Sequence, residues 1–249
     1  MPLVGLGVWQ IPAGRETEQA VAWALEAGYR HVDTAPSYRN EEGVGGAVRT
    51  SGLAREEVFV TTKMTPGAGD PERELTGSLA RLGLDWVDLY LIHWPTGASD
   101  AVWPDFERLH ARGLARAIGV SNYDPGRLGR LVARAAVPPM VNQVDFSPFA
   151  FAPEVVEAHR RAGVVLEAYS PLARGRRIDH PVIAEVARRH GRTPAQVMVR
   201  WAVQRAIPAI PKSGRREHIV ENRRVFDFAL TDADMARLDA LGHRRTRLF

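Results

Sequence analysis

Two lysines are the first residues of this chain that could carry chemistry, because every other Lys-or-Arg position is arginine. The chain has 249 residues with 33 lysines and arginines, and only Lys63 and Lys212 are lysine. Each follows a short apolar run that resembles a β-strand. Arginine is a fixed cation with a planar fork, whereas lysine is a compact charge whose pKa can move. Coding bias and chance would also produce this pattern, so a chemical role for the two lysines depends on which residues stand at the other strand ends.

Four titratable residues, Asp33, Tyr38, Lys63 and His93, could together protonate a carbonyl oxygen. A free tyrosine has a pKa of about 10 and is a reluctant proton donor at neutral pH. A lysine cation about 4 Å away contributes roughly 4 kcal/mol at an effective dielectric near 20. That would depress the pKa of the phenol by up to about two or three. Asp33 would keep Lys63 charged, and His93 can orient the carbonyl. The set predicts a proton relay. The plainer alternative is an internal Asp33–Lys63 ion pair with Tyr38 and His93 at the rim.

Short β-rich runs alternate with segments of helical spacing along the chain. Strands are expected at 3–8, 30–33, 58–62, 87–92, 115–120, 140–143, 164–168 and 207–210. Helices are expected at 16–27, 41–50, 71–82, 103–112, 125–135, 153–161, 181–205 and 215–225. This alternation predicts a parallel sheet, and at this length a closed (β/α)8 TIM barrel is the economical fold. A doubly wound sheet is disfavoured because no G-x-G-x-x-G motif directly follows a strand.

The active site of such a barrel forms where the C-terminal ends of the strands meet. Polar, titratable or aromatic residues stand at seven of these ends: Asp33, Lys63, His93 and Trp94, Ser121 and Asn122, Gln143, Tyr169 and Ser170, and Lys212 and Ser213. A barrel with a purely structural role would not need this collection. We therefore expect a catalytic or binding site at this end.

At these residues the chain resembles the aldo-keto reductase superfamily over nearly its full length. The matching runs are GLGVWQ at 5–10, HVDTAPSYRNE at 31–41, TTK at 61–63, VDLYLIHWP at 87–95, IGVSN at 118–122, NQ at 142–143, YSPL at 169–172 and IPKS at 210–213. It is most similar to the prokaryotic 2,5-diketo-D-gluconate reductase type. The resemblance implies one barrel domain over 1–249.

The resemblance also implies an activity, the NAD(P)H-dependent reduction of small aldehydes and ketones, including dicarbonyls or keto-sugars, to alcohols. Tyr38 would be the general acid. Its supporting residues would be Asp33, Lys63 and His93. The nicotinamide carboxamide would be held by Ser121, Asn122 and Gln143. Tyr169 would stack on the nicotinamide ring.

Further residues are implied for the rest of the cofactor and for the substrate. The implied cofactor residues are Ser170 and Leu172 along the pyrophosphate, Lys212 and Ser213 at the 2′-phosphate, and Glu221 and Asn222 near the adenine. Trp9 and Trp94 would form apolar walls of the substrate pocket. For both tryptophans, ordinary packing at the barrel rim is the plainer interpretation.

His218 departs from the family pattern, because NADP-preferring relatives usually carry an arginine at this place. A histidine with a pKa near 6.5 is mostly neutral at pH 7. Arg174, Arg215 and Arg216 could compensate if they point inward. We expect NADPH to bind better than NADH, with appreciable use of NADH.

The segments that roof the pocket in relatives look short. The loop 93–103 and the tail after Leu241 are brief. We therefore expect an open pocket with broad specificity for small carbonyls. The chain also begins in its first strand, without the N-terminal β-hairpin that closes the bottom of the barrel in relatives, so either the bottom is less covered or the true start lies upstream.

Composition bears on the remaining classes of function. The net charge is +4 at a pI near 9.8, and the basic residues are spread along helical segments rather than clustered with aromatics. We therefore expect no nucleic-acid partner. The chain has no cysteine, no signal peptide pattern and no apolar run that could span a bilayer. We expect a cytoplasmic monomer without a metal or flavin.

Two rival functions remain open at this point. A Schiff-base lyase would also place a lysine at a strand end, but it needs a largely neutral amine. A regulatory subunit that binds a nicotinamide nucleotide with little turnover is the second rival. The complete set of four titratable residues favours catalysis over both.

Overall fold

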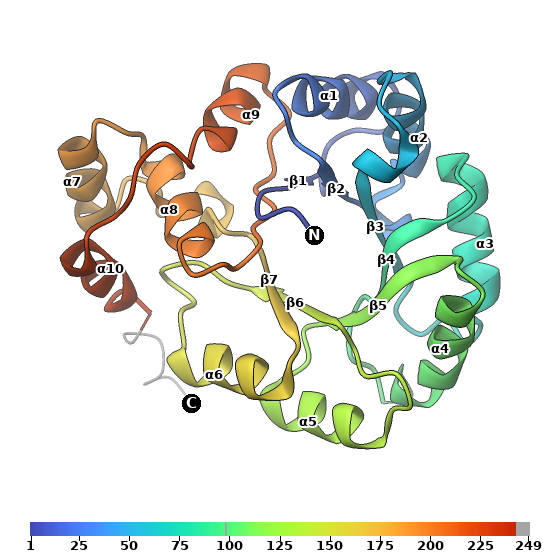
Figure 1. The fold of residues 1–249 in the computed structure, drawn as a ribbon. Helices are drawn as coiled ribbons and strands as arrows, with labels where there is room; N and C mark the ends of the chain where they lie inside the picture. The colour runs from blue at the N-terminus through green and yellow to red at the C-terminus, as the bar shows by residue number, and fades with distance from the viewer. Residues whose placement is uncertain (98, 243–249) are drawn as a thin grey trace.

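Seven parallel strands form one sheet at the centre of the part of the chain that the structure describes, residues 1–97 and 99–242. The structure is a computed structural model. The strands are β1 Leu6–Gly7, β2 His31–Asp33, β3 Phe59–Met64, β4 Val87–Ile92, β5 Ala115–Ser121, β6 Val141–Asp145 and β7 Val165–Tyr169. They follow one another around the sheet in chain order, and helices form a ring outside them (Figure 1). The predicted α/β barrel is confirmed.

The segment after β7 closes the barrel, although it is not the regular eighth strand predicted at 207–210. Ala209 forms bridges both to Val4 and to Ala168 in β7. The amide of Gly5 donates to the carbonyl of Ala209 over 2.9 Å. The flanking residues Pro208 and Pro211 have no N–H to donate, so a continuous ladder cannot form. The barrel is therefore nearly closed, and its last seam consists of isolated bridges.

Helices cover the outside of the sheet. They are α1 Arg15–Glu26, α2 Glu41–Thr50, α3 Pro71–Leu82, α4 Trp103–Ala111, α5 Pro125–Arg134, α6 Pro153–Ala162, α7 Pro181–His190, α8 Pro194–Val203, α9 Arg216–Arg223 and α10 Asp232–Asp239. Short 3-10 helices occur at Pro36–Tyr38, Arg55–Glu57, Ser99–Val102 and Ala173–Gly175. Helices α7 and α10 lie beside α8 at the outer edge of the ring (Figure 1).

One helical prediction was wrong in detail, and one helix was missed. The helix expected at 181–205 is divided, because Gly191 ends α7 in the left-handed conformation at φ 59° and Thr193 caps α8. Helix α10 was not expected, although Thr231 forms a capping box with Asp234 at its start. Both boundaries carry local signals, a glycine after the helix and a capping threonine before it.

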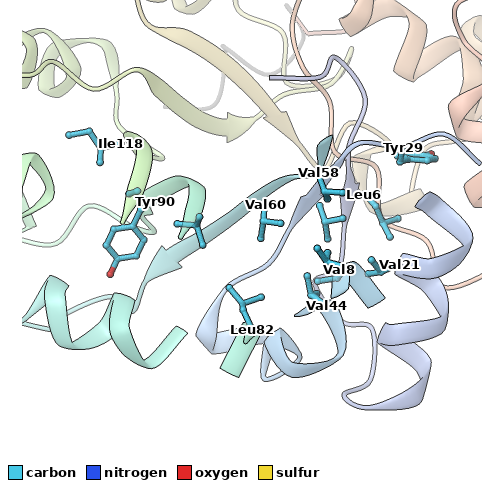
Figure 2. Close-up of a cluster of buried hydrophobic side chains, with 14 of the residues drawn as sticks. Leu6, Val8, Val21, Tyr29, Val44, Val58, Val60, Leu82, Tyr90 and Ile118 are labelled. Atoms are coloured by element: carbon cyan, nitrogen blue, oxygen red, sulfur yellow. The ribbon is translucent and has the colours of Figure 1, made fainter. Parts of the chain in front are cut away.

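Side chains alternate between two interiors along each strand. Val32 and Val60 face the helices and belong to the large apolar cluster that Figure 2 shows in part. Asp33 and Lys63 of the same two strands face the barrel lumen, where they contact each other. This alternation follows from the two-residue period of a strand. The sequence thus places hydrophobic residues under the helices and polar residues along the barrel axis.

The glycine cluster at 43–46 serves close helix packing. A Cβ atom at Gly45 in α2 would lie only 1.8 Å from the carbonyl oxygen of Leu82 in α3. Leu82 itself is fully buried against the strands. The cluster therefore has a packing role. This agrees with the expectation that the chain has no phosphate-binding glycine motif of a doubly wound sheet.

Several predictions concern the chain ends and the loop after β4. Within residues 1–5, Val4 forms an isolated bridge to Ala209. Residue 98 in the loop 93–103 lies outside the described residues, as do residues 243–249 at the end of the predicted domain and tail. None of the helices within 1–97 and 99–242 is long and apolar enough to cross a membrane.

Candidate functional site

A cavity of about 660 Å³ opens at the C-terminal ends of the strands. Most of the residues predicted for the site line it: Trp9, Asp33, Tyr38, His93, Trp94, Ser121, Asn122, Gln143, Tyr169, Ser170, Leu172, Lys212 and His218. Four predicted residues do not line it, namely Lys63, Ser213, Glu221 and Asn222. The convergence expected from strand ends therefore occurs in the fold.

Lys63 lies directly beneath the cavity floor and connects the titratable residues. Its fully buried ammonium donates to Asp33 Oδ1 over 2.7 Å and to the carbonyl of Thr34 over 2.9 Å. It also contacts the phenol oxygen of Tyr38 at 3.3 Å. That phenol lies 3.4 Å from His93 Nε2. The ammonium has three partners for its three N–H groups, so its position and charge are fixed.

The loop after β2 holds Tyr38 over the strand ends. Pro36 opens the 3-10 helix that carries Tyr38, and Arg39 ends it in the left-handed conformation at φ 58°. The buried side chain of Asn40 then donates to the carbonyls of Val8 over 2.9 Å and Ile11 over 3.2 Å. These bonds tie the β2 loop to the loop after β1. The phenol is therefore positioned by backbone contacts on both sides.

Burial dominates the electrostatics of Tyr38. It raises the pKa of the phenol above its usual value of about 10, and the opposing effect of Lys63 does not offset it. The expectation of a depressed pKa was therefore wrong for this state of the site. In the buried site desolvation of the phenolate costs more than one ammonium returns, since Asp33 also opposes the phenolate. Tyr38 consequently keeps its proton at neutral pH.

Lys63 and His93 are held in different charge states. Burial alone would lower the pKa of Lys63, but Asp33 and then Tyr38 outweigh it and the pKa is raised. Burial, and then the charge of Lys63, lowers the pKa of His93 to about 3. At neutral pH the site therefore contains an ammonium, a phenol and a neutral imidazole.

A second hydrogen-bonded group extends across β5, β6 and β7. Ser121 Oγ donates to the carbonyl of Gln143 over 2.8 Å. Asn122 Nδ2 donates to Ser121 Oγ over 2.9 Å, and Asn122 Oδ1 accepts from the Tyr169 phenol over 2.8 Å. Burial raises the pKa of Tyr169 to about 12, so it acts as a donor. These side chains form one preorganised polar wall.

The loop after β7 has unusual backbone geometry. Ser170, Ala173 and Arg174 adopt φ of 50°, 49° and 56°, in the left-handed region that favours glycine. Each such residue stores about 1–3 kcal/mol of strain, which is common beside binding sites. The Arg174 guanidinium lies 5.3 Å from the ring centroid of Trp9. This loop thus reaches across the cavity to the tryptophan after β1.

The two tryptophans at the cavity mouth are partly exposed. Trp9 is 40% and Trp94 is 47% exposed, which is high for side chains of this size. Simple packing at the barrel rim would bury them more completely. Their exposure toward a cavity fits apolar walls for a ligand.

The phosphate end of the predicted cofactor site is less organised. Lys212 and His218 are exposed and line the cavity. The Ser213 hydroxyl accepts from the amide of Arg215 over 3.1 Å. Glu221 accepts a hydrogen bond from Thr193 over 2.6 Å, and so it is tied to the start of α8. Asn222 is buried, and its Oδ1 has no hydrogen-bond partner within the described ranges.

The arginines that could compensate for His218 point in different directions. Arg174 lines the cavity. Arg216 lies 3.5 Å from Glu26 and lines a separate cavity of about 210 Å³ between α1 and α9. Arg215 does not line the main cavity. The structure therefore keeps Arg174 as a candidate for compensation and directs Arg216 away.

Sequence reasoning missed three polar residues of this region. Gln10 lines the cavity in a left-handed conformation at φ 62°. Glu167 and His31 lie fully buried in the lumen below the cavity. The signal for Glu167 was available, since it is an acidic residue inside a strand that was expected to be buried.

Known proteins resemble this chain along nearly its whole length. The profile described as the Aldo/keto reductase family matches residues 3–243. Glyoxal reductase of Bacillus subtilis (strain 168) is 43% identical over 245 residues, with 97% of this chain and 89% of the relative covered. The 9,11-endoperoxide prostaglandin H2 reductase of Trypanosoma cruzi (strain CL Brener) is 44% identical over 249 residues, covering 97% and 88%.

Solved structures agree with the sequence comparison. An aldo-keto reductase from a Medee basin deep-sea metagenome library superposes with a TM-score of 0.93 at 40% identity, covering 97% of this chain and 92% of that one. The Bombyx mori aldo-keto reductase in complex with NADP gives a TM-score of 0.89 at 34% identity, covering 97% and 89%. Profile, relatives and fold thus coincide with a cavity that Asp33, Tyr38 and His93 line and beneath which Lys63 lies. The chain belongs to the aldo/keto reductase family and is an NAD(P)H-dependent oxidoreductase that interconverts carbonyls and alcohols.

Proposed function

We propose that this enzyme reduces small aldehydes and ketones, dicarbonyls among them, with NADPH and with Tyr38 as the general acid. The observation that carries the proposal is the contact chain under the cavity. The Lys63 ammonium lies 3.3 Å from the Tyr38 phenol oxygen, which in turn lies 3.4 Å from His93 Nε2. An acid, a fixed cation and a neutral hydrogen-bonding ring meet at the floor of the cavity.

The residues present fit a nicotinamide dinucleotide. The buried Asn222 Oδ1, which lacks a partner in the described chain, is suited to accept from the amino group of an adenine. The exposed ammonium of Lys212 is suited to a phosphate. Ser121, Asn122 and Gln143 would hold the carboxamide, and Tyr169 would stack on the ring. When bound, the reduced nicotinamide supplies a hydride to the carbonyl carbon.

Ser170 and Leu172 would lie along the pyrophosphate of that cofactor. Ser213 would join Lys212 at the 2′-phosphate, while Glu221 would stand near the adenine. Glu221 already accepts a bond from Thr193, so its part is to fix the position of α9. His218 lines the cavity and would approach the 2′-phosphate.

Tyr38 would deliver its proton as the carbonyl oxygen gains negative charge. Its raised pKa keeps the proton in place until then. The phenolate left behind faces the Lys63 ammonium, which stabilises it without any rearrangement, because Asp33 already orients the amine. His93 is neutral, so its ring orients the carbonyl by a hydrogen bond and does not compete as the acid.

The walls of the cavity favour compact carbonyls with a polar neighbour group. Trp9 and Trp94 offer exposed indole surfaces, and Ser37 and Arg174 add polar groups to the lining. The name of the Bacillus subtilis relative, glyoxal reductase, supports dicarbonyl substrates. We therefore place methylglyoxal and phenylglyoxal before keto-sugars as the first compounds to assay.

Turnover of these dicarbonyls by wild type and by Tyr38→Phe tests the proposal. We expect kcat to fall by about 10²- to 10⁴-fold in the variant, which is the usual contribution of a general acid, with NADPH binding retained. Tyr123→Phe is the matched control, because its phenol bonds to Asp100 and does not line the cavity. A wild type that binds NADPH without turning over any carbonyl would favour a regulatory nucleotide-binding subunit instead.

Cofactor choice and assembly complete the proposal. NADPH should bind better than NADH, but His218 in place of an arginine should leave appreciable use of NADH. We propose that the enzyme works as a cytoplasmic monomer. Sedimentation at catalytic concentrations would test the monomer.

A further inference from the structure

A second buried carboxyl group lies in the barrel lumen below the site, and the proposed reaction does not use it. Glu167 in β7 is fully buried and stands opposite Gln143 of β6 in the strand register. Gln143 Nε2 donates to Glu167 Oε2 over 2.9 Å and to Asp33 Oδ2 over 2.7 Å. Since Asp33 belongs to β2, this amide bridges the lumen between the two carboxyl groups.

The bridge fixes which way the Gln143 amide faces. A primary amide has two N–H donors, and here both are used by carboxyl oxygens. The carbonyl oxygen of the amide is then the group left for the cavity, which Gln143 lines. A rotated amide would lose both bonds to the carboxyl groups. Glu167 and Asp33 together therefore hold the acceptor of Gln143 toward the ligand.

The charges of the lumen decide the state of Glu167. The lumen contains two carboxyl groups, those of Asp33 and Glu167, and the Lys63 ammonium binds Asp33 directly. His31 Nε2 lies 3.6 Å from Glu167 Oε1, but burial, then the charges of the N-terminus and Lys63, lower the pKa of His31 to about 3. Two buried carboxylates this close oppose each other's ionisation. Burial, and then Asp33, raise the pKa of Glu167 well above its usual range.

The proton of Glu167 can be assigned to one oxygen. Oε2 accepts from Gln143, so the acidic hydrogen belongs on Oε1. That oxygen is buried, has no hydrogen-bond partner in the described part of the chain and faces the neutral ring of His31. A neutral carboxylic acid fits this position, whereas a bare carboxylate oxygen would be left without compensation.

We propose that Glu167 is a positioning residue for the reduction. Protonated on Oε1, it holds the Gln143 amide with its oxygen toward the nicotinamide carboxamide and keeps a second negative charge away from Tyr38. The inference rests on the proposed function, because it assumes a nicotinamide above Gln143.

A pH dependence follows from this assignment. The groups that face Glu167 are Asp33 and His31 from β2, Lys63 from β3 and Gln143 from β6, with the N-terminal amine also near enough to act on it. When Glu167 loses its proton at alkaline pH, its charge opposes formation of the Tyr38 phenolate. Turnover should therefore fall on the alkaline side as Glu167 ionises.

Two variants separate the charge of Glu167 from its hydrogen bond. Glu167→Gln keeps an acceptor for Gln143 but cannot ionise, so the alkaline limb of kcat should move upward by about one pH unit. Its Kd for NADPH should stay within about twofold of wild type. Glu167→Leu removes the acceptor, and the Kd for NADPH should rise about tenfold, as for one lost hydrogen bond.

The measurements are the fluorescence of bound NADPH without carbonyl, kcat between pH 6 and 10, and the thermal midpoint of each variant. Thr61→Val is the matched control, since Thr61 is fully buried in the same lumen and contacts His31 but not Gln143. It should move neither the NADPH Kd nor the alkaline limb, because it leaves the amide bridge intact.

If the alkaline fall of kcat occurred at the same pH in Glu167→Gln as in wild type, the inference would be overturned. An unchanged Kd for NADPH in a folded Glu167→Leu would also overturn it. If Glu167→Leu does not fold, the pH profile of Glu167→Gln decides alone. A wild type that neither binds NADPH nor reduces a carbonyl would show instead that the proposed function is wrong, and the inference would fall with it.

Discussion

The two lysines mark two ends of one cavity that are built in different ways. Lys63 is fully buried, and its three donors are all used by Asp33, Thr34 and Tyr38. Lys212 is exposed at the cavity rim. The end proposed for the reaction is therefore fixed before any ligand binds, while the end proposed for the phosphate relies on a solvated cation.

This difference suits the two tasks. A proton must be transferred over a short distance in a fixed direction, so the groups around Tyr38 need a rigid and dry surrounding. A phosphate carries its charge to the protein and must also leave after each turnover. Exposed residues such as Lys212 and His218 can supply attraction without a large desolvation cost. Reactivity and cofactor choice should therefore respond separately to mutation.

The largest expected effect comes from Lys63→Met. We expect kcat to fall at least about 10³-fold, because the phenolate of Tyr38 loses its counter-charge, while the Kd for NADPH changes little. The variant also leaves Asp33 buried without its cation, which should cost about 3–5 kcal/mol of unfolding free energy. Urea unfolding and steady-state kinetics measure the two effects.

The double variant Lys63→Met/Asp33→Leu sharpens this prediction. It removes both charges, so stability should largely return while activity should not. Recovery of turnover in the double variant would contradict a catalytic role for the ammonium. Gln143 loses one acceptor in this background, so NADPH binding should be measured alongside.

The convergence of Asp33, Tyr38, Lys63 and His93 could be predicted from the sequence, because strand geometry brings most of these residues together. The lumen-facing Asp33 and Lys63 lie on adjacent strands, so their contact follows from the fold. The effect of burial on the pKa of Tyr38 was harder to predict. The pKa of Tyr38 is raised because desolvation exceeds the effect of Lys63, and neither quantity can be obtained from spacing.

The phosphate end was less predictable because its residues lie on loops and on α9. Arg216 could equally have faced the cavity, but tertiary contacts place it beside Glu26. The same limit applies to the last strand, where Pro208 and Pro211 reduce the expected ladder to bridges. Glu167 was visible as an acid in an apolar run, yet only the fold shows that it reaches Gln143.

Acid should destabilise the reacting end in a defined way. Burial, more than any other cause, lowers the pKa of His31 and of His93 to about 3. Below pH 6.5 the unfolded chain therefore binds protons at these histidines that the folded chain does not. Unfolding free energy then falls by up to about 1.4 kcal/mol per pH unit for each histidine. Glu167 acts oppositely, because its raised pKa makes the folded state bind the extra proton.

His31, His93 and Glu167 together should therefore contribute about 1.4 kcal/mol per pH unit to the wild-type slope between pH 6.5 and 5. Glu167→Gln removes the opposing contribution, so its slope should be steeper than that of wild type by about 1.4 kcal/mol per pH unit. Urea unfolding at pH 7.5, 6.5, 5.8 and 5.0 measures both slopes. Equal slopes would mean that Glu167 is ionised in the folded protein at neutral pH.

Lys212→Met should affect binding alone. We expect the Kd for NADPH to rise about tenfold, equal to about 1.4 kcal/mol, with the thermal midpoint unchanged because the side chain is exposed. The Kd for NADH, which lacks the 2′-phosphate, should change much less. A comparable loss for both cofactors would place Lys212 at the pyrophosphate instead, and would contradict its assignment to the 2′-phosphate.

The smallest effect is expected from His218→Arg, which tests how far the exposed end can be tuned. An arginine is charged at every working pH and can bind a phosphate through two N–H groups. The preference for NADPH, measured as the ratio of kcat/KM values, should rise about fivefold, which corresponds to about 1 kcal/mol. Because the position is solvated, added salt should reduce the gain. If the increase in NADPH preference persisted in 1 M salt, the end that carries Lys212 and His218 would have to close around its ligand. The difference between this exposed end and the buried end at Lys63 would then exist only before the cofactor binds.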